Sequence, residues 1–185
     1  NRAPGRGYFI NGLEFEYLSQ VVRPRSTPLL TEIHAVDGVK QVWCTFGEDQ
    51  VDLNYRNPDV LLEIVRIIRQ YVEQGIHFFR LDAIAFLWKE SGTSCVHLPQ
   101  THELIKLLRL VIENLDPSAV IITETNVPNR ENLSYFGNDN EAHLIYNFSL
   151  PPLLLYSILS GDCKHLKTWM TSMPPARSGR AYLNF

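Results

Sequence analysis

Apolar residues recur at helical spacing over two long segments of the chain. The first follows Asn57-Pro58 and has apolar residues at 60, 61, 64, 65, 67, 68 and 71, with Gly75 just beyond. This pattern predicts a helix, since proline suits a first helical turn and glycine suits the position after the last. A second helix is predicted over residues 101–115, ended by Asp116-Pro117.

Short, nearly continuous apolar runs lie between these helices and after them. The runs at 76–82, 119–124 and 142–148 predict strands that are buried on both faces, as in a parallel sheet. Segments 129–136, 152–159 and 164–172 predict helices, and 180–185 predicts the start of another strand. Alternating strands and helices indicate the α/β class, although periodicity alone does not separate a closed barrel from an open sheet.

The first fifty residues have a different character. They contain prolines, glycines and two β-type runs, 29–34 and 41–46, separated by Asp37-Gly38. An Asp-Gly pair between two such runs predicts a hairpin turn. Residues 1–50 are therefore expected to form a loop-rich β segment that precedes the α/β part, residues 51–185.

Composition narrows the possible functions. The chain has 185 residues, 45% hydrophobic and 20% charged, which fits a globular domain and excludes a disordered chain or a coiled coil. The net charge of −3 and the lack of a basic patch argue against a nucleic-acid partner. No apolar run approaches the ~20 residues that span a bilayer, so no membrane partner is expected.

Cysteine and histidine usage argues against metal or disulfide chemistry. Cys44, Cys95 and Cys163 are odd in number and widely spaced, which is typical of reduced thiols in a cytoplasmic protein. The six histidines show no ligand spacing. We therefore expect neither a metal nor a cofactor.

Two carboxylates follow predicted strands. Asp82 ends the strand at 76–82 and Glu124 ends the next, and sites in parallel α/β folds form at these carboxyl ends. Two acids on either side of one bond are the requirement for glycoside hydrolysis. Arg80 lies on the same side of its strand as Asp82 and is expected to keep it ionised. The alternative is an ion pair with a purely structural role.

Three segments around these acids resemble conserved regions of the α-amylase family, glycoside hydrolase family 13. They are Phe79-Arg80-Leu81-Asp82-Ala83, Ile121-Ile122-Thr123-Glu124-Thr125-Asn126 and the segment 50–58, in the family's order and with helix-length gaps. Segments 88–95, 97–103 and 146–152 resemble its sucrose phosphorylase branch, which includes glucosylglycerate phosphorylases. The resemblance extends from about Val22 to Phe185.

The resemblance implies a fold and an activity. The fold would be part of a (β/α)₈ TIM barrel, about its fourth to seventh strands, with residues 51–185 in the barrel and 1–50 at the end of domain B. Asp82 would be the nucleophile and Glu124 the acid/base in retaining transfer of glucose from an α-glucoside such as sucrose to inorganic phosphate. Arg80, Phe86 and Asn126 would bind substrate. A hydrolase and a non-catalytic amylase-like binding protein remain alternatives.

Two features of the family are not found in the chain. These are the first conserved region, an Asp and a His, and the Ser-His-Asp segment that follows the position of Phe185 in relatives and carries the third acid. We therefore expect the chain to be a fragment that is inactive by itself and prone to associate, because a cut barrel exposes sheet edges.

Other polar residues are expected to be structural. Asp52 and Asn54, which could ligate calcium in amylases, are expected to cap the turn before Pro58. His77 is expected in the core. Asp139 and Glu141 are expected in a solvated loop.

Overall fold

The computed structural model describes residues 7–36, 38–174 and 180–184. Asp37 of the predicted turn and Phe185 of the predicted last strand lie outside these ranges. By its internal contacts the chain divides into two units. Unit 1 comprises Asn1–Tyr71 and Ala85–Thr101, and unit 2 comprises Val72–Ile84 and His102–Phe185. The assignment of residues 1–50 to a domain B stays a prediction.

The main feature of unit 1 is an antiparallel hairpin. Strands β1 (Leu30–Ala35) and β2 (Gly38–Trp43) pair from Leu30 opposite Trp43 to Ala35 opposite Gly38, which confirms the predicted hairpin. Short 3₁₀ turns precede it at Gly12–Glu14 and Leu18–Gln20. One cluster of buried side chains in this unit gathers around the fully buried Trp43 and contains Ile10, Leu29, Trp43 and Cys95.

The first predicted helix is confirmed as α1 (Pro58–Glu73), which continues across the boundary between the units. Oδ1 of Asn57 accepts a hydrogen bond from the Asp59 amide at 3.0 Å, so Asn57 caps this helix. Gly75 follows with φ +85°, a left-handed conformation that glycine adopts without a Cβ penalty.

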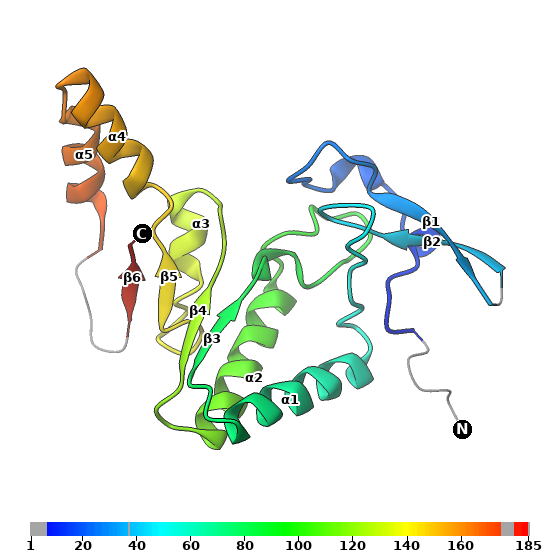
Figure 1. The fold of residues 1–185 in the computed structure, drawn as a ribbon. Helices are drawn as coiled ribbons and strands as arrows, with labels where there is room; N and C mark the ends of the chain where they lie inside the picture. The colour runs from blue at the N-terminus through cyan, green and yellow to red at the C-terminus, as the bar shows by residue number, and fades with distance from the viewer. Residues whose placement is uncertain (1–6, 37, 175–179, 185) are drawn as a thin grey trace. The chain divides into compact units, whose positions relative to one another are not determined.

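Unit 2 contains a parallel sheet of four strands (Figure 1). The strands are β3 (Phe78–Leu81), β4 (Val120–Thr123), β5 (Leu144–Tyr146) and β6 (Ala181–Leu183). They lie in chain order, β3-β4-β5-β6, without the reversal that marks a doubly wound sheet, and so favour part of a barrel. The helices are α2 (Pro99–Leu115), α3 (Asn129–Ser134), α4 (Leu150–Ser160) and α5 (Lys164–Ser172).

One face of strand β3 is buried and the other is open. Phe79, Ile121 and Ile145 are buried, whereas Phe78, on the opposite face of β3, is 66% exposed. The expectation that both faces are buried is therefore wrong for β3 in this chain, because the side chains that bury the sheet lie on one face only. The open face carries Arg80 and Asp82, which alternate with the buried residues.

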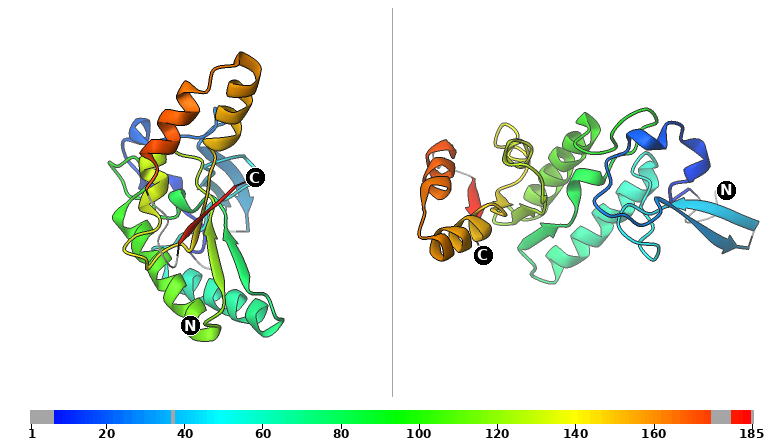
Figure 2. Two further views of the ribbon diagram at one scale, coloured as in Figure 1. Left: turned by 90° about the vertical axis from the view of Figure 1, so that its left-hand side faces the viewer. Right: turned by 90° about the horizontal axis from the view of Figure 1, so that it is seen from above.

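Helices α4 and α5 pack against each other and lie side by side in both views of Figure 2. Helix α4 also exposes large apolar side chains, with Ile158 and Leu159 more than three-quarters exposed. Among the described residues, no helix is both long and apolar enough to cross a membrane.

Candidate active site

The two predicted acids occupy equivalent positions on neighbouring strands. The register pairs Leu81 of β3 with Thr123 of β4. The next residues, Asp82 and Glu124, therefore lie at the same level where these neighbouring strands end. A hydrogen bond of 3.0 Å from the Glu124 amide to the Leu81 carbonyl continues the pairing to this level. Because neighbouring strands lie about 4.8 Å apart, both acids start from backbone positions that suit a retaining carboxylate pair.

Arg80 contacts Asp82 as the sequence predicts. One guanidinium nitrogen, Nη1, lies 2.5 Å from Oδ1 of Asp82, and both side chains are well exposed, 47% and 69%. Burial acts against the charge of Arg80, but hydrogen bonds to Asp82 and Tyr146 outweigh it and raise the pKa of Arg80. The contact thus places a permanent positive charge beside the predicted nucleophile.

Glu124 is oriented by the residue that follows Asp82. The backbone N–H of Ala83 donates a hydrogen bond to Oε2 of Glu124 at 3.2 Å. Ala83 has φ +48°, in the left-handed region that residues with a Cβ seldom adopt. The carboxyl of Glu124 therefore points toward the end of β3, the strand that carries Asp82.

The other predicted substrate residues lie in different surroundings. Asn126 is exposed, two residues beyond Glu124. Phe86 belongs to unit 1, where its ring lies edge-on to Phe46 at 5.4 Å and its carbonyl accepts a hydrogen bond from Nζ of Lys89. The structure therefore groups Arg80, Asp82 and Glu124, and leaves the roles of Phe86 and Asn126 as proposals.

Tyr146 is a site residue that the sequence reasoning did not single out. It ends β5, and the register that pairs Thr123 with Ile145 places it level with Glu124 on the next strand. The Arg80 guanidinium carbon lies 5.6 Å from the centre of its ring. Its place at the end of the strand after Glu124 was the available signal, because this is the edge where sites form.

Asp52 forms a buried ion pair instead of a helix cap. Its Oδ2 lies 2.9 Å from Nζ of Lys89, which is 2% exposed, and both carboxylate oxygens accept hydrogen bonds from Thr45. The capping expectation is therefore wrong for Asp52. Asn54 does stabilise the turn, since its Oδ1 accepts the Arg56 amide at 3.2 Å.

Two further expectations are wrong. His77 is exposed and pairs with Asp116 instead of lying in the core, because β3 starts at Phe78, two residues after the predicted start of the strand. Glu141 is 2% exposed rather than solvated, and its Oε2 lies 2.7 Å from Nδ1 of His102. Sequence spacing did not reveal this pair, since its members are 39 residues apart.

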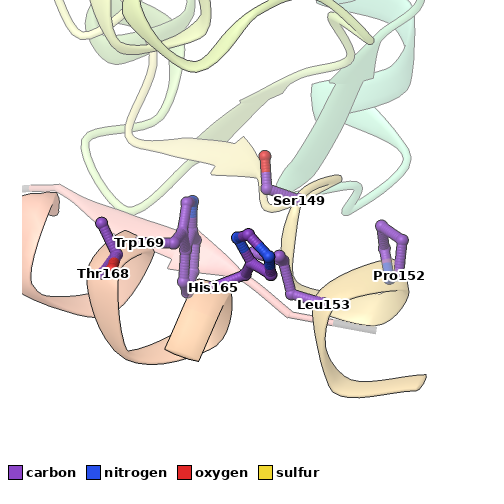
Figure 3. Close-up of a pocket in the computed structure, with 6 residues that line it drawn as sticks. All are labelled: Ser149, Pro152, Leu153, His165, Thr168 and Trp169. Carbon is purple, nitrogen blue, oxygen red and sulfur yellow. The ribbon is translucent and has the colours of Figure 1, made fainter. Parts of the chain in front are cut away.

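Helices α4 and α5 line a cavity of about 490 Å³ together with Ser149, and Figure 3 shows its side chains. The lining consists of Ser149, Pro152, Leu153, His165, Thr168 and Trp169, and so includes neither predicted acid. Within residues 7–36, 38–174 and 180–184, no three histidine, cysteine or acidic side chains are grouped closely enough to hold a metal ion.

Comparison with known proteins identifies the class. The family model for the α-amylase catalytic domain matches residues 40–173, so the chain belongs to the α-amylase family. The family resemblance and the partial barrel predicted from the sequence are thereby confirmed.

The most informative relatives are phosphorylases. The chain is 51% identical over 168 residues to the glucosylglycerate phosphorylase of Spirochaeta thermophila and 48% identical over 170 residues to that of Escherichia coli. In each case the match covers 91% of this chain but only 29% and 30% of the relative. The structure also resembles sucrose 6F-phosphate phosphorylase from Thermoanaerobacter thermosaccharolyticum, with a TM-score of 0.76 at 20% identity over 91% of this chain and 36% of that one.

Proposed function

We propose that this chain contributes the nucleophile and the acid/base of a retaining α-glucosyl phosphorylase, in a longer protein that we call the parent. The observation that carries the proposal is the adjacent placement of Asp82 and Glu124 at the carboxyl ends of β3 and β4. The Arg80 contact to Asp82 and the Ala83 hydrogen bond to Glu124 support separate roles for the two acids.

In the first step, a carboxylate oxygen of Asp82 attacks the anomeric carbon of an α-glucoside. The bond from that carbon to the leaving oxygen breaks, and Glu124 gives this oxygen its proton. In the second step, Glu124 takes a proton from inorganic phosphate, whose oxygen attacks the same carbon and releases Asp82. Two inversions retain the configuration and yield α-glucose 1-phosphate.

Identity to glucosylglycerate phosphorylases favours glucosylglycerate as donor, ahead of sucrose. Arg80, Phe86 and Asn126 are proposed to bind substrate. Hydrolysis, with water in place of phosphate, is the second candidate, because the same two acids serve both reactions.

The test uses the parent with glucosylglycerate or sucrose, with and without phosphate. We expect α-glucose 1-phosphate only when phosphate is present. Equal donor cleavage without phosphate, with free glucose as product, would replace phosphorolysis by hydrolysis. No cleavage of either donor by a folded parent would favour a non-catalytic binding role.

Variants assign the roles. Asp82→Asn should abolish donor cleavage, and Glu124→Gln should lower kcat by about 10²–10⁴-fold, the usual contribution of general acid–base catalysis. Glu103→Gln is the matched control, because Glu103 is exposed on α2 and pairs only with Lys106 among the contacts described for it. A folded Asp82→Asn protein with full activity would remove Asp82 from the mechanism.

A further inference from the structure

The carboxyl edge of the sheet carries a third aligned position beside the two acids. Extending the register from Leu81–Thr123 and from Thr123–Ile145 gives the row Asp82, Glu124 and Tyr146. These residues lie on one face of the sheet, because each follows a residue of the opposite face. Asp82 and Tyr146 thus lie level with Glu124 on opposite sides of it, Asp82 beyond β3 and Tyr146 on β5.

Arg80 joins the two outer strands of this row. Its guanidinium contacts Asp82 on its own strand and the ring of Tyr146 on β5, although β4 lies between β3 and β5. The side chains of Arg80 and Tyr146 together therefore bridge the strand that ends at Glu124. A guanidinium stacks on an aromatic face while its N–H groups remain free to bind a carboxylate.

The backbone and the ring of Tyr146 both make contacts that fix their positions. Its carbonyl accepts a hydrogen bond from Nδ2 of Asn132 at 2.8 Å, and the buried Asn132 in turn accepts one from the hydroxyl of Thr125 at 2.6 Å. Its ring stacks on Phe148 with centroids 5.4 Å apart. The exposed Arg80 side chain thus contacts a residue whose backbone is hydrogen-bonded and whose ring is stacked on another ring.

We propose that Tyr146 is a positioning residue for the nucleophile, its ring holding the Arg80 guanidinium against the carboxylate of Asp82. The proposal rests on the function proposed above for Asp82. Without the ring, Arg80 would sample more rotamers and spend less time beside Asp82, so that fewer molecules would hold an oriented nucleophile.

The experiment compares Tyr146→Leu and Tyr146→Met, which remove both the aromatic face and the hydroxyl, with Tyr146→Phe, which keeps the face and removes only the hydroxyl that hydrogen-bonds Arg80. Donor cleavage by the parent is followed by release of the leaving group, so phosphorolysis and hydrolysis count equally. We expect kcat/KM to fall about tenfold in the Leu and Met variants and less than about threefold in the Phe variant.

A second background separates positioning from direct contact with the sugar. In an Arg80→Lys parent, which lacks the flat guanidinium, Tyr146→Leu should cost less than about threefold. An equal loss in both backgrounds would overturn the proposal. So would failure of both the Leu and Met variants to show a cooperative unfolding transition, because Tyr146 would then serve the fold.

The two proposals fail in different ways. A folded wild-type parent that cleaves neither donor would refute the proposed function. An active wild type whose Tyr146→Leu variant retains its rate would refute the role of Tyr146 alone.

Discussion

The amide of Ala83 donates a hydrogen bond to Oε2 of Glu124, which joins the residue after the proposed nucleophile to the proposed acid/base. Ala83 adopts φ +48°. Residues held in this region cost free energy and persist where the surrounding structure fixes them, often at functional sites. The conformation of one backbone position thus links the orientations of the two acids.

Substitutions at Ala83 test this link. Ala83→Gly removes the Cβ penalty but adds backbone entropy to the unfolded chain, so the free energy of unfolding should change by less than about 1 kcal/mol. Ala83→Val places a branched side chain in the left-handed region and should lower it by about 1–3 kcal/mol. Urea unfolding measures both. A Val variant as stable as wild type would contradict the expected strain.

The loss of the buried ion pair between Lys89 and Asp52 should lower the free energy of unfolding markedly. Burial lowers the pKa of Lys89, and Asp52 counteracts this effect. Lys89→Met leaves the Asp52 carboxylate without its cation and should lower the free energy of unfolding by about 3–5 kcal/mol. Lys106→Met is the control: Lys106 pairs with Glu103 on a helix surface, and no measurable change is expected. Equal effects of the two substitutions would contradict the prediction.

His143 should make stability depend on pH. The Ile121 amide donates to Nδ1 of His143 at 3.0 Å, and burial followed by the nearby Arg109 lowers the pKa of His143. The unfolded histidine, with its pKa of 6.5, therefore binds a proton more readily than the folded one. The free energy of unfolding should fall as pH drops below about 6.5.

His143→Gln provides the control for this pH effect. Its amide oxygen can accept the Ile121 hydrogen bond but does not titrate, so the stability loss between pH 6.5 and 5 should be smaller than in wild type. Asp116, whose pKa is lowered to about 2 mainly by its hydrogen bond with His77, changes charge at more acidic pH and does not interfere. Identical pH dependence in wild type and variant would exclude His143 as the cause.

Two buried threonines should respond oppositely to loss of their hydroxyl groups. Oγ1 of Thr123 has no hydrogen-bond partner among the described residues, whereas Oγ1 of Thr101 accepts the Trp88 amide at 3.3 Å. Thr123→Val should therefore preserve or raise the unfolding midpoint, and Thr101→Val should lower stability by about 1 kcal/mol. Thermal unfolding monitored by circular dichroism checks both. A larger loss for Thr123→Val than for Thr101→Val would contradict this assignment.

Thiol reactivity should distinguish the three cysteines. Cys163 is exposed, whereas Cys44 and Cys95 are buried, and burial is the main cause that raises the pKa of Cys44. A thiol reagent should therefore modify one cysteine in the native chain and three after unfolding, as counted by mass spectrometry. Rapid modification of a native Cys163→Ser variant would show that a buried thiol is accessible.

Much of the fold could be predicted because its signals are local. The hairpin at 30–43 follows from an Asp-Gly pair, and α1 follows from apolar spacing between Pro58 and Gly75. Glu141 shows the limit: Gly137-Asn138-Asp139-Asn140 resembles a solvated loop, yet Glu141 is buried against His102 of α2. The pairing depends on where the loop meets the helix, and no local pattern carries that information.

The sequence by itself determined the α/β class and the family, and it predicted Asp82 and Glu124 as the acids, because strand ends and motifs are properties of short segments. It also predicted the contact between Arg80 and Asp82, since residues two apart on a strand share a face. Only the tertiary structure decided that Tyr146 meets Arg80 and that Ala83 binds Glu124. Both contacts join different strands, and the alignment of strands depends on packing and hydrogen bonding across the sheet.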